Sequence, residues 1–251
     1  MLDTVPAESR LRARADRWAR WAGLAAGVVV AQLLAAMDSD GLGSGVLYAL
    51  AGFGLCAVGG VLLGDALAPR PREAVRTAGL TPRRVRDQVP PRMSRLLILQ
   101  AATLVLLLTV TTTVASADDL GRAGRAFAVT CGGATEVHGP WPGSFYAVPI
   151  LGSLAVGTAV CGWALRRIAH RPGGEQERRD RSSAITAAWG LLVSTQLLGA
   201  ATTVTGALTS TTCDGAIGTG AVVVLAPPAL LALLTVAWCF FTVLSPRAAR
   251  R

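Results

Sequence analysis

Six long runs of apolar residues dominate this sequence and leave few options for its fold. They cover residues 21–37, 45–67, 96–115, 146–165, 185–208 and 217–244. A helix needs about 20 mostly apolar residues to cross the hydrocarbon core of a bilayer, and only helices satisfy their backbone polar groups within one such segment. Only 16% of the residues are charged, against about a quarter in soluble domains. The sequence therefore predicts an all-α, polytopic membrane protein with six transmembrane helices arranged as three hairpins.

The distribution of arginine predicts how these spans are oriented. All 24 cationic residues are Arg, and the formal net charge is +9. Apart from Arg122 and Arg125, they all fall in 1–20, 66–95, 166–184 and the tail after residue 244. The remaining connections carry acidic residues instead. Because cytoplasmic loops are enriched in Arg and Lys, we expect both termini to be cytoplasmic.

This orientation predicts a basic cytoplasmic segment over 1–20, a six-helix transmembrane domain over 21–244 and a basic cytoplasmic tail over 245–251. The complete use of Arg in place of Lys is typical of a GC-rich genome, so we expect the plasma (inner) membrane of a bacterium. Residues 21–36 also follow a basic region as a signal peptide does, but the apolar stretch is longer than the usual 7–15 residues. We therefore expect the first span to be retained.

The basic connection over residues 69–95 is the main candidate for an interaction surface. Its eight Arg residues from Arg70 to Arg95 favour contact with anionic lipid headgroups on the cytoplasmic face. Docking of a cytoplasmic protein partner, for example an ATPase, is the alternative. The segment has no interleaved aromatic residues and adjoins the membrane, so we expect no nucleic acid there.

Within the predicted spans, ionisable chemistry is almost absent. Asp65, at the inner end of the second span, is the one charged residue inside a run. We interpret it as an interfacial carboxylate, with a proton or cation site at the inner mouth as the alternative. Threonines of the third span and the Ser194–Thr195–Gln196 run of the fifth favour helix packing, with the lining of a substrate path as the alternative.

Two further patterns concern the shape of the spans. Gly60 and Gly64 form a small-xxx-small pair that suits close helix approach, either within one chain or between two copies. Pro227 and Pro228 are expected to kink or break the sixth helix, because proline lacks the backbone donor that a helix needs.

Five cysteines divide by position. Cys56, Cys161 and Cys239 lie in predicted spans, whereas Cys131 and Cys213 lie in two predicted outer connections. An outer compartment is oxidising, so we expect a disulfide between Cys131 and Cys213. A zinc site that adds Glu136 and His138 to Cys131 is the alternative, but no structural zinc module has this spacing.

The connection over 116–145 is rich in Gly and Pro, so we expect it to be irregular. Trp141 within it is expected to lie at the outer membrane interface.

The sequence lacks several common catalytic signatures. It has no Gly-rich phosphate loop followed by Lys, no Gly-x-Ser-x-Gly, no Cys-x-x-Cys and no His-Glu-x-x-His. We therefore expect no enzyme, metal or cofactor, and favour a non-enzymatic membrane component such as a transporter subunit or partner-binding protein. The layout alone is similar to that of permease subunits of bacterial exporters driven by a separate ATPase. The alternatives are a self-sufficient carrier or channel, and a membrane enzyme or sensor with its site in the outer loop 116–145.

Overall fold

The computed structural model describes residues 7–37, 44–67, 91–170, 175–212 and 215–245. Almost all of this described part is helical, in six helices that are each long and apolar enough to cross a membrane. The helices are α1 (Ala7–Ala36), α2 (Ser44–Leu67), α3 (Pro91–Thr113), α4 (Ser144–His170), α5 (Glu175–Thr209) and α6 (Gly215–Leu244). The prediction of six apolar helices of membrane-spanning length is thus confirmed.

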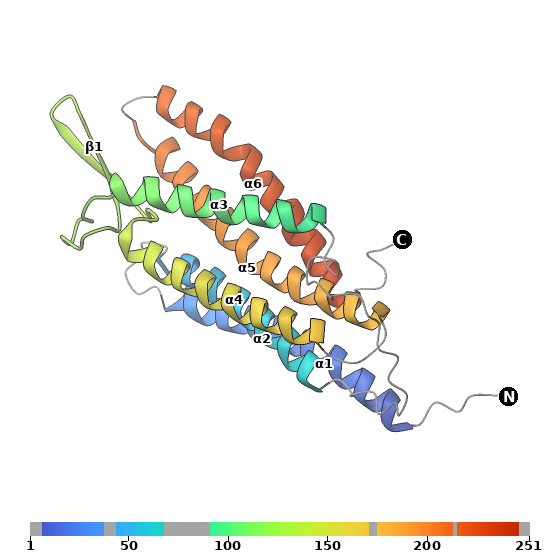
Figure 1. Ribbon diagram of the computed structural model, residues 1–251. Coiled ribbons are helices and arrows are strands. Elements are labelled where there is room, and N and C mark those ends of the chain that lie inside the picture. The colour runs from blue at the N-terminus through green and yellow to red at the C-terminus, as the bar shows by residue number, and fades with distance from the viewer. Residues whose placement is uncertain (1–6, 38–43, 68–90, 171–174, 213–214, 246–251) are drawn as a thin grey trace.

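The helices run alternately in opposite directions along one bundle. Figure 1 shows the starts of α1, α3 and α5 and the ends of α2, α4 and α6 at one end, with a small β-hairpin at the other. We call the first of these the arginine-rich end, because Arg20, Arg95, Arg167 and Arg181 lie near it. Consecutive helices α1 and α2 pack along each other, as do α5 and α6, whereas α3 and α4 touch each other little and each packs on α5.

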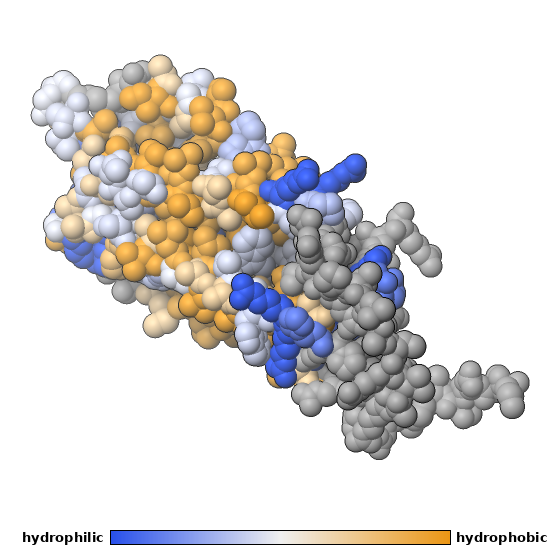
Figure 2. All heavy atoms as spheres, in the orientation of Figure 1, coloured by the Kyte–Doolittle hydropathy of each residue, from blue (hydrophilic) through white to orange (hydrophobic). Residues whose placement is uncertain are grey.

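Helix α5 lies at the centre of the bundle, although its apolar segment has the lowest mean hydropathy of the six. That value is 1.4 for α5 and 2.3 for α6, yet most of the α5 segment is buried while most of α6 is exposed. Apolar side chains accordingly cover much of the face in Figure 2. A buried α5 and an exposed α6 are expected in lipid. A helix that carries Ser, Thr and Gln must bond these side chains to other helices, whereas an apolar helix can face acyl chains.

Glycine brings α1 and α2 into backbone contact. A Cβ added to Gly60 would lie 2.5 Å from the Cα of Gly23, and one added to Gly23 would lie 2.4 Å from the Cα of Gly60. A Cβ at Gly64 would lie 2.5 Å from a carboxylate oxygen of Asp16. The small-xxx-small pair therefore serves packing within one chain, which decides between the two roles that its sequence left open.

The connection between α3 and α4 is not the irregular loop expected from its composition. It contains an antiparallel pair of strands, β1 (Phe127–Cys131) and β2 (Ala134–His138), in which Val129 is paired with Glu136. Gly132 and Gly133 form the two-residue turn with φ of 57° and 89°. Such a turn requires positive φ at both positions, which glycine adopts without steric cost. The alternation of side chains on either side of this Gly-Gly pair was the missed signal.

Trp141 is also placed differently from the expectation of an interfacial ring. It is buried, stacks on Phe127 with ring centroids 4.7 Å apart, and donates from Nε1 to the Thr111 carbonyl over 2.9 Å. The hydroxyl of Thr111 in turn donates to the Pro142 carbonyl over 2.7 Å. These bonds hold the hairpin connection against the end of α3.

At Pro227 and Pro228, where a kink or a break was expected, α6 does not break but continues as one helix from Gly215 to Leu244. Proline in a membrane helix is tolerated where neighbouring groups can satisfy the freed carbonyls.

Candidate functional site at the arginine-rich end

The arginine-rich end is held together by charged side chains from three helices, α1, α2 and α5. Arg20 of α1 donates from Nε and Nη2 to the two carboxylate oxygens of Asp16, over 3.0 and 2.8 Å. Its Nη1 lies 3.5 Å from the carbonyl oxygen of Val243, in the last turn of α6. Arg20 is only 9% exposed. A buried cation is costly unless it is paired, so this two-oxygen contact explains how Arg20 can cross from α1 to α6.

Asp65, the carboxylate singled out in the sequence, is part of a second contact of this kind. It accepts a hydrogen bond from Nη1 of Arg181 over 3.2 Å, and the two side chains are 12% and 14% exposed. Arg181 also donates from Nη2 to Glu177. The structure therefore places Asp65 in an ion pair that joins the end of α2 to the start of α5. Its interpretation as an interfacial carboxylate and the alternative of a proton or cation site both stay predictions.

The start of α5 is a charged helical segment that precedes its apolar part. Glu175 pairs with Arg179, Gln176 donates to Asp180 over 3.1 Å, and Glu177 pairs with Arg181. Each contact joins residues four apart, the spacing at which side chains meet on one helix face. Together with the anchor at Asp65, these contacts fix a charged surface at the arginine-rich end. Of the predicted basic segment 69–95, residues 69–90 lie outside the described part of the chain.

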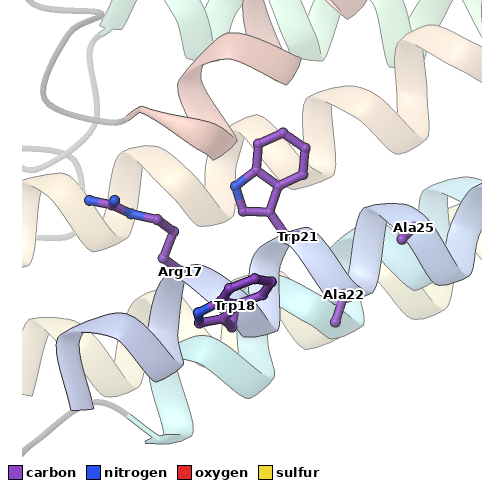
Figure 3. A pocket seen from close by; sticks show the side chains of 5 residues that line it. All are labelled: Arg17, Trp18, Trp21, Ala22 and Ala25. Carbon is purple, nitrogen blue, oxygen red and sulfur yellow. The ribbon is translucent and has the colours of Figure 1, made fainter. Parts of the chain in front are cut away.

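A groove lies on α1 at the same end of the bundle. Its lining includes Arg17, Trp18, Trp21, Ala22 and Ala25 (Figure 3). Trp18 is 72% exposed and Trp21 is 48% exposed, although both are large aromatic side chains. The opposite face of α1, with Gly23 and Arg20, is the one that packs on α2 and α6. The groove is therefore an outward-facing surface of the bundle.

The interior of the bundle uses its polar side chains to join helices. Gln100 of α3 donates to the Thr235 hydroxyl of α6 over 2.8 Å and accepts from the Ser194 hydroxyl of α5 over 2.8 Å. Gln196 of α5 donates to the Ser153 hydroxyl of α4 over 2.6 Å. The Oε1 atom of Gln196 is buried without a hydrogen-bond partner among the described residues. Most of the polar run on α5 thus contributes interhelical bonds, as the packing hypothesis proposed.

The threonines near the ends of α3 and α5 satisfy their own helices. The hydroxyls of Thr109, Thr112, Thr202 and Thr203 each donate to a carbonyl three or four residues earlier. Such bonds satisfy the hydroxyl group within its own helix, so that it needs no partner on another helix. This geometry favours the packing role of these residues over a substrate path.

At the opposite end of the bundle, the hairpin is bonded to the connection between α5 and α6. Glu136 accepts from the backbone N–H of Thr212 over 3.1 Å and from its hydroxyl. His138 Nε2 lies 3.3 Å from the same carboxylate, and its Nδ1 lies 3.1 Å from the Ser210 hydroxyl. The bonds from Thr212, together with His138, hold the pKa of Glu136 below its usual range.

Cys131 and Cys213 were predicted to form a disulfide near this cluster. Cys213 and the side chain of Cys131 lie outside the described residues, so their predicted disulfide stays a prediction. The described cysteines Cys56, Cys161 and Cys239 are free thiols. For the zinc alternative, the structure brings Glu136 and His138 together, but no group of three potential ligands occurs among the described side chains.

Sequence reasoning found Asp65 and the basic character of this end but missed Arg20 and Arg181 as its structural centres. The i,i+4 spacing of Asp16 and Arg20 was a usable signal for the first. Asp65, the partner of Arg181 on another helix, lies 116 residues away in the chain, and no local sequence pattern predicts this pair. The chain matches no protein-family model, no curated protein and no solved structure.

Proposed function

We propose that this chain is a non-enzymatic subunit of the inner membrane that acts through a cytoplasmic protein partner bound at its arginine-rich end. The proposal includes the topology argued from the Arg distribution, with three helical hairpins and both termini in the cytoplasm. A partner that supplies energy, such as an ATPase, fits a subunit of this size.

One observation carries the proposal: the charged start of α5 is a fixed surface. The predicted fifth span begins near residue 185, but α5 begins at Glu175. Ten helical residues extend about 15 Å, so this segment reaches beyond the span. Its side-chain pairs and the Asp65–Arg181 contact hold it in place. A preformed surface binds a partner without the cost of ordering a loop.

Co-purification with charge-changed variants tests the partner. The tagged chain, purified from its native membranes after mild cross-linking, is expected to carry a stoichiometric ATPase. Arg179→Glu should lower the yield of that ATPase, because it reverses an exposed charge at this surface. Asp119→Arg is the matched control, since it reverses an exposed charge near the hairpin end.

A double exchange separates the surface charge from helix stability. Glu175→Arg with Arg179→Glu restores the i,i+4 pair and the net charge but inverts their order on the surface. If the ATPase recognises the order of these two charges, the double variant still binds less ATPase although α5 is helical. Equal yields from all variants, or solute transport by the purified chain alone in liposomes, would contradict the proposal and favour a self-sufficient carrier.

The orientation has its own test. A fluorescent reporter that matures only in the cytoplasm, fused after Arg251, is expected to be bright. A dark fusion, with activity instead from a phosphatase that works only outside the cytoplasm, would require an odd number of spans.

A second candidate, a sensor at the hairpin end, is favoured by the bonded cluster of Glu136, His138, Ser210 and Thr212. It predicts that His138→Ala abolishes function while the protein still inserts normally. Retained function in His138→Ala would remove this candidate and leave the partner proposal intact.

A further inference from the structure

We propose that the groove on α1 is a binding site for one acidic phospholipid, with the headgroup at Arg17 and an acyl chain along Ala22 and Ala25. The groove is lined from Arg17 to Ala25 on an exposed face of α1. The proposal concerns lipid alone and does not depend on the function proposed above.

Arg17 supplies the charge that such a headgroup needs. Its neighbour Arg20 is engaged by Asp16 and the Val243 carbonyl. Arg17 is exposed and has no ion-pair partner in the described part of the chain. A guanidinium binds phosphate oxygens through two parallel hydrogen bonds, which makes Arg well suited to a phosphodiester.

The position of Arg17 along the helix places that charge at the level of headgroups. The apolar segment of α1 begins at Ala15, so Arg17 lies in its first turn. Trp18 and Trp21 follow directly, and tryptophan is enriched where headgroups meet acyl chains. A phosphate at Arg17 is therefore at its ordinary depth in a bilayer.

The deeper part of the groove suits an acyl chain. Figure 3 shows Arg17 and Trp21 rising from the same side of α1, with the short side chains of Ala22 and Ala25 farther along the helix. From Arg17 to Ala25 the helix rises about 12 Å, enough to follow a substantial part of an acyl chain. The larger rings of Trp18 and Trp21 line the groove beside these small residues. A charged head followed by an apolar tail in this order is the pattern of an acidic phospholipid.

Tryptophan quenching by brominated lipid tests the site with the purified full chain. Two sets of phosphatidylcholine vesicles contain the same minor fraction of brominated lipid. The brominated lipid is phosphatidylglycerol in one set and phosphatidylcholine in the other. The quenching that arises in the groove is the quenching of the unchanged chain minus the quenching of the double variant Trp18→Phe with Trp21→Phe. We expect the occupancy from this difference to be about fivefold higher for phosphatidylglycerol, the factor that about 1 kcal/mol per Arg near the surface represents.

Two single variants assign the selectivity to Arg17. Arg17→Gln should remove the preference for phosphatidylglycerol and leave quenching by phosphatidylcholine unchanged. Arg166→Gln is the control, because Arg166 is an exposed arginine near the same end, on α4. It should retain the preference.

Three results would overturn the proposal. Equal quenching by the two brominated lipids would mean that any bilayer lipid fills the groove. Equal losses in Arg17→Gln and Arg166→Gln would mean that the whole basic end attracts acidic lipid. An unchanged signal in the variant without Trp18 and Trp21 would mean that lipid does not reach these rings and that protein covers them.

Discussion

Gly60→Ala is expected to destabilise the bundle, although alanine is the better helix former. The added Cβ would lie 2.5 Å from the Cα of Gly23 and 3.0 Å from the carbonyl oxygen of Ala19. Non-bonded carbons sit best at about 3.5–4.0 Å, so α1 and α2 would have to separate by about 1 Å. Overpacking of this kind costs about 1–3 kcal/mol, and we expect about 2 kcal/mol here.

Gly59→Ala is the matched control for this prediction. A Cβ at Gly59 meets no atom within 4 Å, so it changes helix propensity as Gly60→Ala does but adds no contact. The difference between the two variants therefore isolates the packing cost. Reversible unfolding by SDS in mixed micelles, followed by circular dichroism, measures both free energies of unfolding.

Two outcomes would refute the reasoning. If Gly59→Ala and Gly60→Ala unfold at the same SDS fraction, the α1–α2 contact is not as close as the structure has it. If Gly60→Ala converts a dimer to a monomer without changing the unfolding of the monomer, the glycine pair serves association of two copies. Gly23→Ala probes the same contact from the other helix and should match Gly60→Ala.

Three further predictions follow from the charged and sulfur-containing groups. Cys131 and Cys213 should both resist a membrane-impermeant maleimide in non-reduced protein and react together after reduction; labelling of Cys131 alone without reductant would exclude the pairing. Asp65→Asn should lower stability by about 1 kcal/mol in the SDS assay, because it breaks a largely buried contact, with a smaller effect for Glu177→Gln at a more exposed pair; equal effects would argue against the contact between α2 and α5. The lowered pKa of Glu136 means that its contribution to stability is present above its ordinary value of 4.5 and is lost as the pH falls through the lower value in the folded protein. Hydrogen exchange of the hairpin should therefore accelerate in acid, an acceleration that Glu136→Gln removes; a variant that keeps the same pH dependence would assign it to another group.

The candidate site was partly predictable from sequence, and the part that was missed has a physical explanation. The basic character of one end and the position of Asp65 follow from residue identity alone. The Asp65–Arg181 contact requires that α2 and α5 lie side by side with these two residues facing each other. Whether Asp65 and Arg181 face each other depends on the rotation of each helix about its own axis, and the packing of the whole bundle sets this rotation.

The sequence by itself determined the number and location of the apolar helices. Transfer of a segment of about 20 residues into lipid is a local, additive property, so each run could be recognised without knowledge of its neighbours. The same locality limited the prediction of the hairpin, since its Gly-Gly turn is a short signal inside a loop of mixed composition.

Only the tertiary structure decided which helix lies in the centre. Hydropathy alone would place α5 last among the six helices for burial in an apolar core, since its mean hydropathy is the lowest, yet α5 is the most buried. Lipid and protein interior are similarly apolar, so hydrophobicity does not choose between them; close packing and interhelical hydrogen bonds do. Those interactions, such as the contact of Gln100 with Ser194 and that of Gly23 with Gly60, join residues far apart in the chain and exist only once the helices are assembled.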